Sequence, residues 1–231
     1  MLLTLDDFKE DVGRSPETRQ FNILLLGMSN SGKTHWAKLL ARTFGYKHIE
    51  FDGLMGNSEE IADLIRNISG QDEAERMGRY FGMPWEPGFQ EKEDGYLAVE
   101  GRLMSKEYGP GSILDLTGSA IYIPDQLARI AQTGLVIHLA TSQEARGKII
   151  AEMLKDYVNK PKPVCWNGIF NQKAGETGEE ALKRCYPLLV SSREELYKRF
   201  SNITLPYHVH KALTSAEDFM QAVYRQLEAK K

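Results

Sequence analysis

The chain has 231 residues, of which 42% are hydrophobic and 26% are charged, as is typical of a globular protein with a substantial core. Its formal net charge of -3 at pH 7 leaves no broad cationic field, so we expect neither a nucleic-acid nor a membrane partner. No apolar run approaches the roughly 20 residues that cross a bilayer, and the N-terminus lacks the features of a signal peptide. Two cysteines, Cys165 and Cys185, form no metal or redox motif. These features predict a cytoplasmic protein.

The first part of the chain alternates strand and helix patterns. Residues 1–20 are polar and predict a short helix and a linker, an N-terminal extension to a single domain over 21–231. The apolar run at 22–27 is typical of a strand buried on both faces of a parallel sheet. Apolar residues at helical spacing follow over 32–44. A second short strand is expected at 47–52.

The rest of the chain continues the alternation. Further apolar runs predict strands at 112–118, 135–140 and 202–209, with helical segments between them. The stretch at 157–175 is rich in Pro, Gly and Asn and predicts a flexible lid. Pro187 predicts a kink or break in the helix expected at 179–200. Strands that alternate with helices throughout indicate a doubly wound α/β fold with a central parallel sheet.

The octet GMSNSGKT, residues 27–34, lies between the first strand and the first long helix and fits the pattern G-x-x-x-x-G-K-[ST]. Gly27 and Gly32 allow the backbone N–H groups to face phosphate oxygens, and the helix N-terminus adds partial positive charge. Lys33 supplies a cation for the β and γ phosphates, and Thr34 a hydroxyl for Mg²⁺. The alternative is an ordinary glycine-rich turn, which matches by chance in on the order of one per cent of chains this size. The predicted ATP-binding residues are Gly27, Ser29, Asn30, Ser31, Gly32, Lys33 and Thr34. The fold predicted on this basis is an α/β P-loop NTPase, a three-layer sandwich with a flexible lid.

Three carboxylates close predicted strands, where ligands of open α/β sheets bind. Asp115 closes the stretch SILD within the strand expected at 112–118 and could hold Mg²⁺, or equally could form the turn after it. Glu50 and Asp52 end the strand at 47–52, and strand alternation puts both on one face. Either could instead cap the following helix. We predict Thr34, Glu50 and Asp115 as candidate metal ligands, acting directly or through water.

From about Phe21 to the C-terminus these residues resemble the shikimate kinases and the related small-molecule P-loop kinases. The stretch GMSNSGKTHWAKLLARTFGYKHIEFD looks like the family's P-loop, first helix and acidic second strand. The family's Asp-x-Asp reads Glu50-Phe51-Asp52 here. The resemblance implies transfer of the γ-phosphoryl group of ATP to a hydroxyl of a small polar metabolite, shikimate or a similar hydroxylated acid. Asp52 would hold and activate the acceptor hydroxyl, and Glu50 would lie near the metal.

The acceptor-binding motifs match the family only in part. The stretch GFQEKE resembles the family's Phe-Arg-x-x-Glu, with Phe89 and Glu93 matched, but Gln90 replaces the arginine that grips the substrate carboxylate. The stretch DLTGSA stands where the family has a triple-glycine turn against the substrate ring. Gly118 is kept there, while Ser119 departs. The resemblance thus implies substrate contacts from Phe89, Gln90, Gly118 and Ser119.

The C-terminal motifs complete the resemblance. LLVSSREELYKRFSNITL is similar to the family's Leu-x-x-Arg-x-x-Leu-Tyr helix and last strand, and Arg193 matches the second substrate-binding arginine. The family's lid carries Arg-Pro, where this chain has Lys162-Pro163. Lys162 can supply the charge near the transferring phosphate but not the bidentate fork, and it could simply be a solvated loop lysine. The expected catalytic residues are Lys33, Asp52 and Lys162. Two alternatives stay open, a nucleoside or nucleotide kinase and a catalytically inactive kinase-like nucleotide-binding module.

Overall fold

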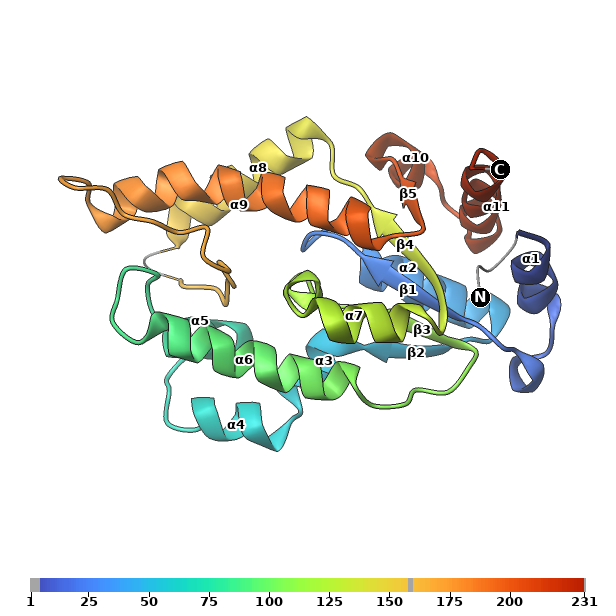
Figure 1. Cartoon of the computed structure of the whole chain (residues 1–231), viewed down its shortest axis with the longest axis horizontal. Coiled ribbons are helices and arrows are strands. Elements are labelled where there is room, and N and C mark those ends of the chain that lie inside the picture. The colour runs from blue at the N-terminus through green and yellow to red at the C-terminus, as the bar shows by residue number, and fades with distance from the viewer. Residues whose placement is uncertain (1–4, 158–159, 231) are drawn as a thin grey trace. The chain divides into compact units, whose positions relative to one another are not determined.

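The computed structural model describes residues 5–157 and 160–230 (Figure 1). The chain forms two compact units. The sheet unit comprises Met1–Asp52, Met104–Ser142 and Glu194–Lys231, and the helical unit comprises Gly53–Leu103 and Gln143–Arg193. The boundary predicted between an extension, 1–20, and a domain, 21–231, stays a prediction.

The sheet unit is built around five parallel strands, which confirms the predicted α/β fold with a central parallel sheet. The strands are β1 (Asn22–Leu26), β2 (Lys47–Glu50), β3 (Ser112–Asp115), β4 (Gly134–Leu139) and β5 (Ile203–Leu205), in the order β2-β3-β1-β4-β5. Every residue of β1 and β3 is buried, as expected for strands covered by helices on both faces. This order puts the end of β1 between the ends of β3 and β4, where ligands of such sheets bind.

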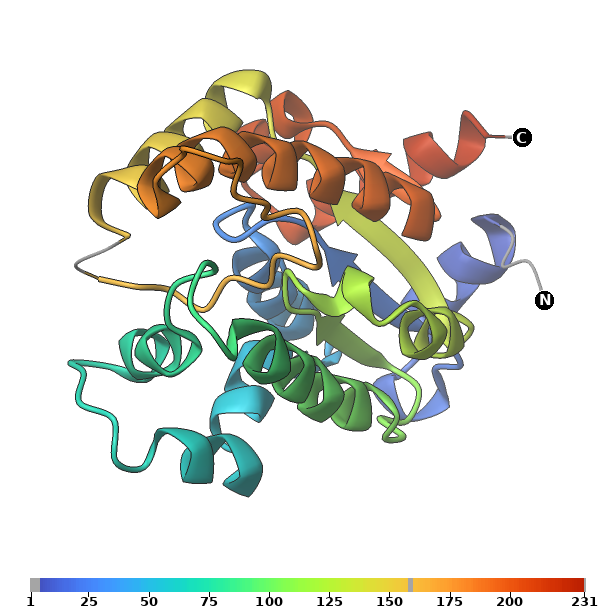
Figure 2. The same cartoon turned by 60° about the vertical axis from the view of Figure 1, so that its left-hand side comes forward.

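Helices of the sheet unit cover this sheet. They are α1 (Leu5–Gly13), α2 (Lys33–Phe44), α7 (Pro124–Ala131), α10 (Tyr207–Ala212) and α11 (Ala216–Glu228), with 3-10 turns at Pro16–Thr18 and Ala120–Tyr122. Trp36 of α2, Phe219 of α11 and Phe8 of α1 belong to one core cluster with Ile23 and Leu25 of β1. The first and last helices, α1 and α11, lie side by side at the same end of the molecule's sheet unit (Figure 1, Figure 2).

The helical unit contains α4 (Glu59–Ile65), α5 (Glu73–Phe81), α6 (Phe89–Met104), α8 (Gln143–Asp156) and most of α9 (Gly178–Phe200). Two of these helices have side-chain caps, because Ser58 accepts the N–H of Ile61 and Asp72 accepts the N–H of Glu75. The short helix α3 (Phe51–Gly56) follows β2. No helix in the described ranges, 5–157 and 160–230, is long and apolar enough to span a membrane.

Four sequence predictions about element ends differ from the structure. The strands predicted at 47–52 and 112–118 end earlier, at Glu50 and Asp115. The strand predicted at 202–209 ends at Leu205, and Tyr207 already begins α10. Pro206 stands at the N-cap, where its missing N–H ends the strand pairing and its fixed φ suits a helix start.

Of the kink or break predicted at Pro187, the break is absent, since α9 runs unbroken from Gly178 to Phe200; the kink stays a prediction. Leu188 is exposed, but Cys185 and Tyr186 before Pro187 and Leu189 and Val190 after it are buried. The packing of these residues outweighs the one lost hydrogen bond.

Candidate active site

The loop between β1 and α2 has a backbone that its glycines permit. Gly27 has φ 151° and Gly32 has φ 104°. A side chain at Gly27 would place its Cβ 2.8 Å from both the Leu139 carbonyl oxygen and Ser31 Oγ, so only glycine fits. Asn30 also has a positive φ, of 63°. The loop leads directly into the N-terminus of α2, whose first N–H groups have no partner within their own helix.

The side-chain ammonium group of Lys33 lies against this loop. Its side chain is buried, with 7% exposed. Its Nζ donates to the carbonyl oxygens of Gly27, at 3.1 Å, and Met28, at 3.2 Å. A buried ammonium needs such oxygen partners, and phosphate oxygens are chemically equivalent partners of higher charge.

Thr34 and Asp115, which are far apart in the sequence, meet through a hydrogen bond. Thr34 Oγ1 donates to Asp115 Oδ2 at 2.6 Å. His48 Nε2 lies 3.7 Å from the same carboxylate oxygen. Asp115 ends β3 beside β1 and pairs in register with Glu50 of β2, so two carboxylates occupy neighbouring positions at the carboxyl edge. The Glu50 side chain is partly exposed and lies 4.0 Å from Lys38.

The Thr34 hydroxyl and the Asp115 carboxylate suit Mg²⁺ better than they suit a metal ion whose ligands all come from the protein. Among the described residues no group of three or more His, Cys, Asp or Glu side chains could hold a metal ion. Mg²⁺ is commonly held by one or two protein oxygens, with waters and substrate phosphates completing the coordination. The Thr34 hydroxyl and the Asp115 carboxylate fit that pattern.

Asp52 lies where the strand pattern did not put it. β2 ends at Glu50, and Asp52 stands in the first turn of α3, so strand alternation does not relate it to Glu50. A carboxylate in the first turn is favoured by the helix dipole. Desolvation by the surrounding protein raises the pKa of Asp52 although part of its side chain stays exposed. Lys33 opposes this shift, and the negative charges of Asp115 and Glu50 add to it. Lys33, Asp115 and Glu50 therefore each act electrostatically on Asp52.

The turn after β3 contains two predicted substrate residues. The Gly118 carbonyl oxygen accepts a hydrogen bond from Tyr197 Oη at 2.7 Å. The Ser119 hydroxyl lies 3.2 Å from the Thr117 hydroxyl, and its side chain is buried. This turn follows the end of β3 within a few residues, so the sheet unit carries it at the same edge as the loop 27–34.

In the helical unit, Phe89 and Gln90 begin α6 and have different environments. Phe89 is buried and its ring centroid lies 5.9 Å from that of Phe81, a core contact. Gln90 is exposed and donates through Nε2 to Asp94 Oδ1 at 2.9 Å, one turn along the helix. Gln90 is neutral, and its amide group bonds within its own helix and not to an anion-binding partner.

Glu93 and Arg193 hold the backbone of one segment from two sides. Arg193 Nη2 donates to the Cys165 carbonyl oxygen at 2.7 Å, and the Asn167 N–H donates to Glu93 Oε1 at 2.6 Å. Trp166, which lies between Cys165 and Asn167 in the sequence, is 1% exposed. Burial raises the pKa of Glu93, while hydrogen bonds from the segment and the charge of Arg193 oppose the rise.

Comparison with known proteins shows which proteins this chain is similar to. No family model matches the chain. A curated shikimate kinase from Nitrosomonas europaea is 26% identical over 208 residues, covering 89% of this chain and 78% of that protein. A solved shikimate kinase from Acinetobacter baumannii, in complex with shikimate, superimposes with a TM-score of 0.50 at 21% identity, covering 94% of this chain and 99% of that one. The chain has a shikimate kinase-like P-loop fold. Its curated relative supports an ATP-dependent small-molecule kinase.

On this shikimate kinase-like fold the predicted lid, 157–175, is held in several places, although 158 and 159 lie outside the described residues. Val164, Cys165 and Trp166 are buried. Lys162, by contrast, is exposed. A lid that moves would carry the contacts of the buried residues with it or break them, and the flexible lid stays a prediction.

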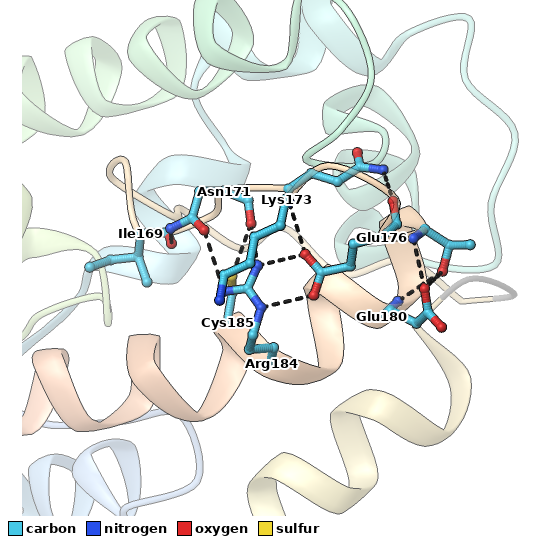
Figure 3. A network of polar contacts seen from close by, with 9 residues as sticks. Ile169, Asn171, Lys173, Glu176, Glu180, Arg184 and Cys185 are labelled. Atoms are coloured by element: carbon cyan, nitrogen blue, oxygen red, sulfur yellow. Dashed lines mark hydrogen bonds and ion pairs between the residues drawn. The ribbon is translucent and has the colours of Figure 1, made fainter.

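The end of the lid segment is fastened to the start of α9 by Arg184 (Figure 3). Arg184 donates to both carboxylate oxygens of Glu176, at 2.8 and 2.7 Å, and to the Asn171 carbonyl oxygen at 2.7 Å. The Lys173 N–H also donates to Glu176, at 3.0 Å. Hydrogen bonds from Arg184 and from Lys173 lower the pKa of Glu176 to about 2. We call Asn171, Glu176 and Arg184 the loop latch.

The sequence reading missed three polar residues that the structure ties to the site. The first is His48, which lies beside Asp115. The other two are His138 of β4 and Glu194 of α9, which lie next to each other. An imidazole within an apolar strand run, as at His138, is the sequence signal for such a buried polar contact. Tyr197 lay within a quoted motif, but nothing in the sequence connected it to Gly118.

Proposed function

We propose that this chain is a kinase that transfers the γ-phosphoryl group of ATP to a hydroxyl of a small polar metabolite, with shikimate or a similar hydroxylated acid as the leading acceptor. The observation that carries the proposal is the 2.6 Å Thr34–Asp115 hydrogen bond beside the Lys33-bearing loop. It joins the hydroxyl and the carboxylate that P-loop enzymes use around the phosphates. The likeness to the Nitrosomonas europaea shikimate kinase supports the acceptor class.

The phosphate groups would be bound by the loop 27–34. Its N–H groups and the α2 N-terminus favour anions, and Lys33 would exchange its carbonyl partners for β- and γ-phosphate oxygens. Thr34 would hold Mg²⁺, with Asp115 or Glu50 acting through water. When bound, the ion neutralises charge on the transferring phosphate. Most of the catalytic effect would come from positioning and charge neutralisation.

Asp52 would orient the acceptor hydroxyl and take its proton. As the acceptor oxygen bonds to the γ phosphorus, the bond from phosphorus to the β,γ-bridging oxygen breaks and ADP leaves with that electron pair. The proton then passes from Asp52 to solvent. A raised pKa makes the Asp52 carboxylate a better proton acceptor than that of an ordinary aspartate.

The remaining predicted residues are proposed for acceptor binding. The Gly118 turn with Ser119 would meet one face of the acceptor. From the helical unit, we propose Arg193 and Gln90 as groups that bind its anionic or hydroxylated end. Phe89 would act by packing, given its burial. Lys162 is exposed, which leaves its charge available for the transferring phosphate.

The test is phosphotransfer from ATP to a panel of shikimate, quinate, gluconate and nucleosides. We expect a hydroxylated acid to be phosphorylated, and Lys33→Ala to lower kcat by at least about a hundred-fold. Lys47→Ala, an exposed lysine of the same unit, is the matched control and should stay within about two-fold. Phosphorylation of a nucleoside alone would instead indicate a nucleoside kinase. Binding of ATP with no acceptor phosphorylated would indicate an inactive nucleotide-binding module.

A further inference from the structure

Three buried polar side chains of the sheet unit form a group behind the ends of β3 and β4. We call His138, Glu194 and Tyr197 the buried trio. They are 0%, 3% and 0% exposed, respectively. His138 belongs to β4, and the other two lie about one turn apart on α9, a spacing that puts both on one helix face.

Glu194 holds the end of β4. Its Oε2 lies 3.2 Å from His138 Nε2, and its Oε1 accepts the Thr141 N–H at 3.0 Å. The Thr141 hydroxyl also donates to this oxygen. Burial alone would raise the pKa of Glu194, but hydrogen bonds from His138 and Thr141 lower it overall. The carboxylate therefore stays charged and fixed between strand and turn.

Tyr197 connects this group to the turn after β3. Its ring lies over the His138 imidazole, with centroids 5.4 Å apart and planes 33° apart. Its hydroxyl donates to the Gly118 carbonyl oxygen at 2.7 Å. One helix face thus fixes the backbone beyond β3 and β4, the two strands that flank β1.

Packing alone does not account for these residue types. A carboxylate and an imidazole cost free energy when buried, and apolar side chains of similar volume would commonly pack as well or better. What polar side chains add is direction, because a hydrogen bond fixes where its partner points. Tyr197 provides that direction for the Gly118 carbonyl, and His138, which faces Glu194, packs against the ring of Tyr197.

We propose that Tyr197, oriented by His138 and Glu194, is a positioning residue that sets the Gly118 turn for the phosphoryl acceptor. The inference rests on the proposed function, in which this turn meets the acceptor. Tyr197 would act through the turn, so its loss should weaken acceptor binding while the phosphate loop keeps its affinity for ATP.

The test compares Tyr197→Phe with Tyr46→Phe. Tyr46 is also a buried tyrosine of the sheet unit, and its hydroxyl has no hydrogen-bond partner among the described residues. We expect Tyr197→Phe to raise the acceptor KM about five-fold, the effect of losing one neutral hydrogen bond. The KM for ATP should change less than about two-fold, and Tyr46→Phe should change neither constant. Equal acceptor KM values in the two variants would overturn the proposal.

A second variant tests the trio as a unit. Glu194→Gln keeps an acceptor for the Thr141 N–H but loses the charge that faces His138. We expect it to raise the acceptor KM, and the double variant with Tyr197→Phe to show less than the product of the two single effects. Full multiplicativity would overturn the coupling.

Hydrogen exchange separates this inference from the proposed function. In Tyr197→Phe the amides of 118–123 should exchange faster than in wild type, and in Tyr46→Phe they should not. If the wild type phosphorylates no acceptor, the proposed function fails, while the exchange result still decides whether Tyr197 fixes the turn. Unchanged exchange in Tyr197→Phe would refute that role.

Discussion

At the scale of single residues, Asp52 shows how competing charges set a pKa. Desolvation, Asp115 and Glu50 raise the pKa of its carboxyl group, and Lys33 lowers it, with a net rise. A carboxyl group with a higher pKa folded than unfolded binds more protons in the native state. Stability therefore falls as the pH rises from the unfolded pKa through the folded one.

This sign gives a prediction for Asp52→Asn. Removing the carboxylate should raise the melting temperature at pH 7 relative to wild type, and the gain should shrink as the pH falls toward 4. Activity should fall by at least about a hundred-fold, because the variant lacks the proposed proton acceptor. Thermal unfolding without nucleotide, run from pH 4 to 8, measures the first effect and steady-state kinetics the second. A variant less stable than wild type at pH 7 but not at pH 4 would contradict the sign.

Residue patterns predicted the backbone of the loop at 27–34 well and its surroundings less well. The pattern at 27–34 requires glycines, and Gly27 and Gly32 do adopt positive φ. The rule on strand ends led to Asp115, which accepts a hydrogen bond from Thr34 in the structure; its role as a metal ligand stays a prediction. The rule failed for Asp52, because the short acidic sequence Glu50-Phe51-Asp52 fits the end of a strand as well as the first turn of a helix. Contacts such as Tyr197 to Gly118 depend on packing between distant segments, which no local pattern encodes.

At the scale of elements, the sequence predicted all five observed strands. The apolar runs of β1 and β3 suit strands that are buried throughout, whereas β2, with only Ile49 buried, is a short mixed run. The ends were harder. Pro206 stops β5 earlier than the apolar run suggested, while Pro187 fails to stop α9. Proline has opposite consequences at these two places because tertiary packing supports the helix around Pro187 and nothing requires the strand to continue beyond Pro206.

The loop latch gives a prediction at this scale. Arg184→Gln removes a bidentate ion pair and a bond to the Asn171 carbonyl, so amides at 171–177 should exchange about ten-fold faster. Lys183→Gln, an exposed neighbour on the same helix, is the control and should leave exchange unchanged. Because the pKa of Glu176 is lowered to about 2, the latch is present above the usual carboxyl range and is lost only as the pH falls toward 2. Corrected exchange that differed between pH 5 and pH 8 would contradict this account.

At the scale of the whole molecule, the first and last helices, α1 and α11, both belong to the sheet unit and pack against each other. Phe8 of α1 is 0% exposed and its ring meets Tyr224 of α11 at 6.2 Å between centroids. Asp11 is buried and accepts the N–H groups of Gln20 and Phe21, just before β1. Residues 5–20 are thus tied to the core by packing and by hydrogen bonds, which their polar sequence did not indicate.

The packing of α1 leads to the prediction that Phe8→Ala destabilises the protein by about 3 kcal/mol, the usual cost of deleting a buried aromatic ring and leaving a cavity. The ring belongs to the core cluster that also contains Trp36 and Phe219, so the loss should appear in the unfolding of the sheet itself and not as local fraying of one helix. Leu188→Ala, at a residue 53% exposed on α9, is the control and should change stability by less than about 0.5 kcal/mol. Urea unfolding followed by circular dichroism measures both variants. Equal midpoints for Phe8→Ala and wild type would mean that α1 is dispensable, and residues 1–20 would then be an extension in the energetic sense as well.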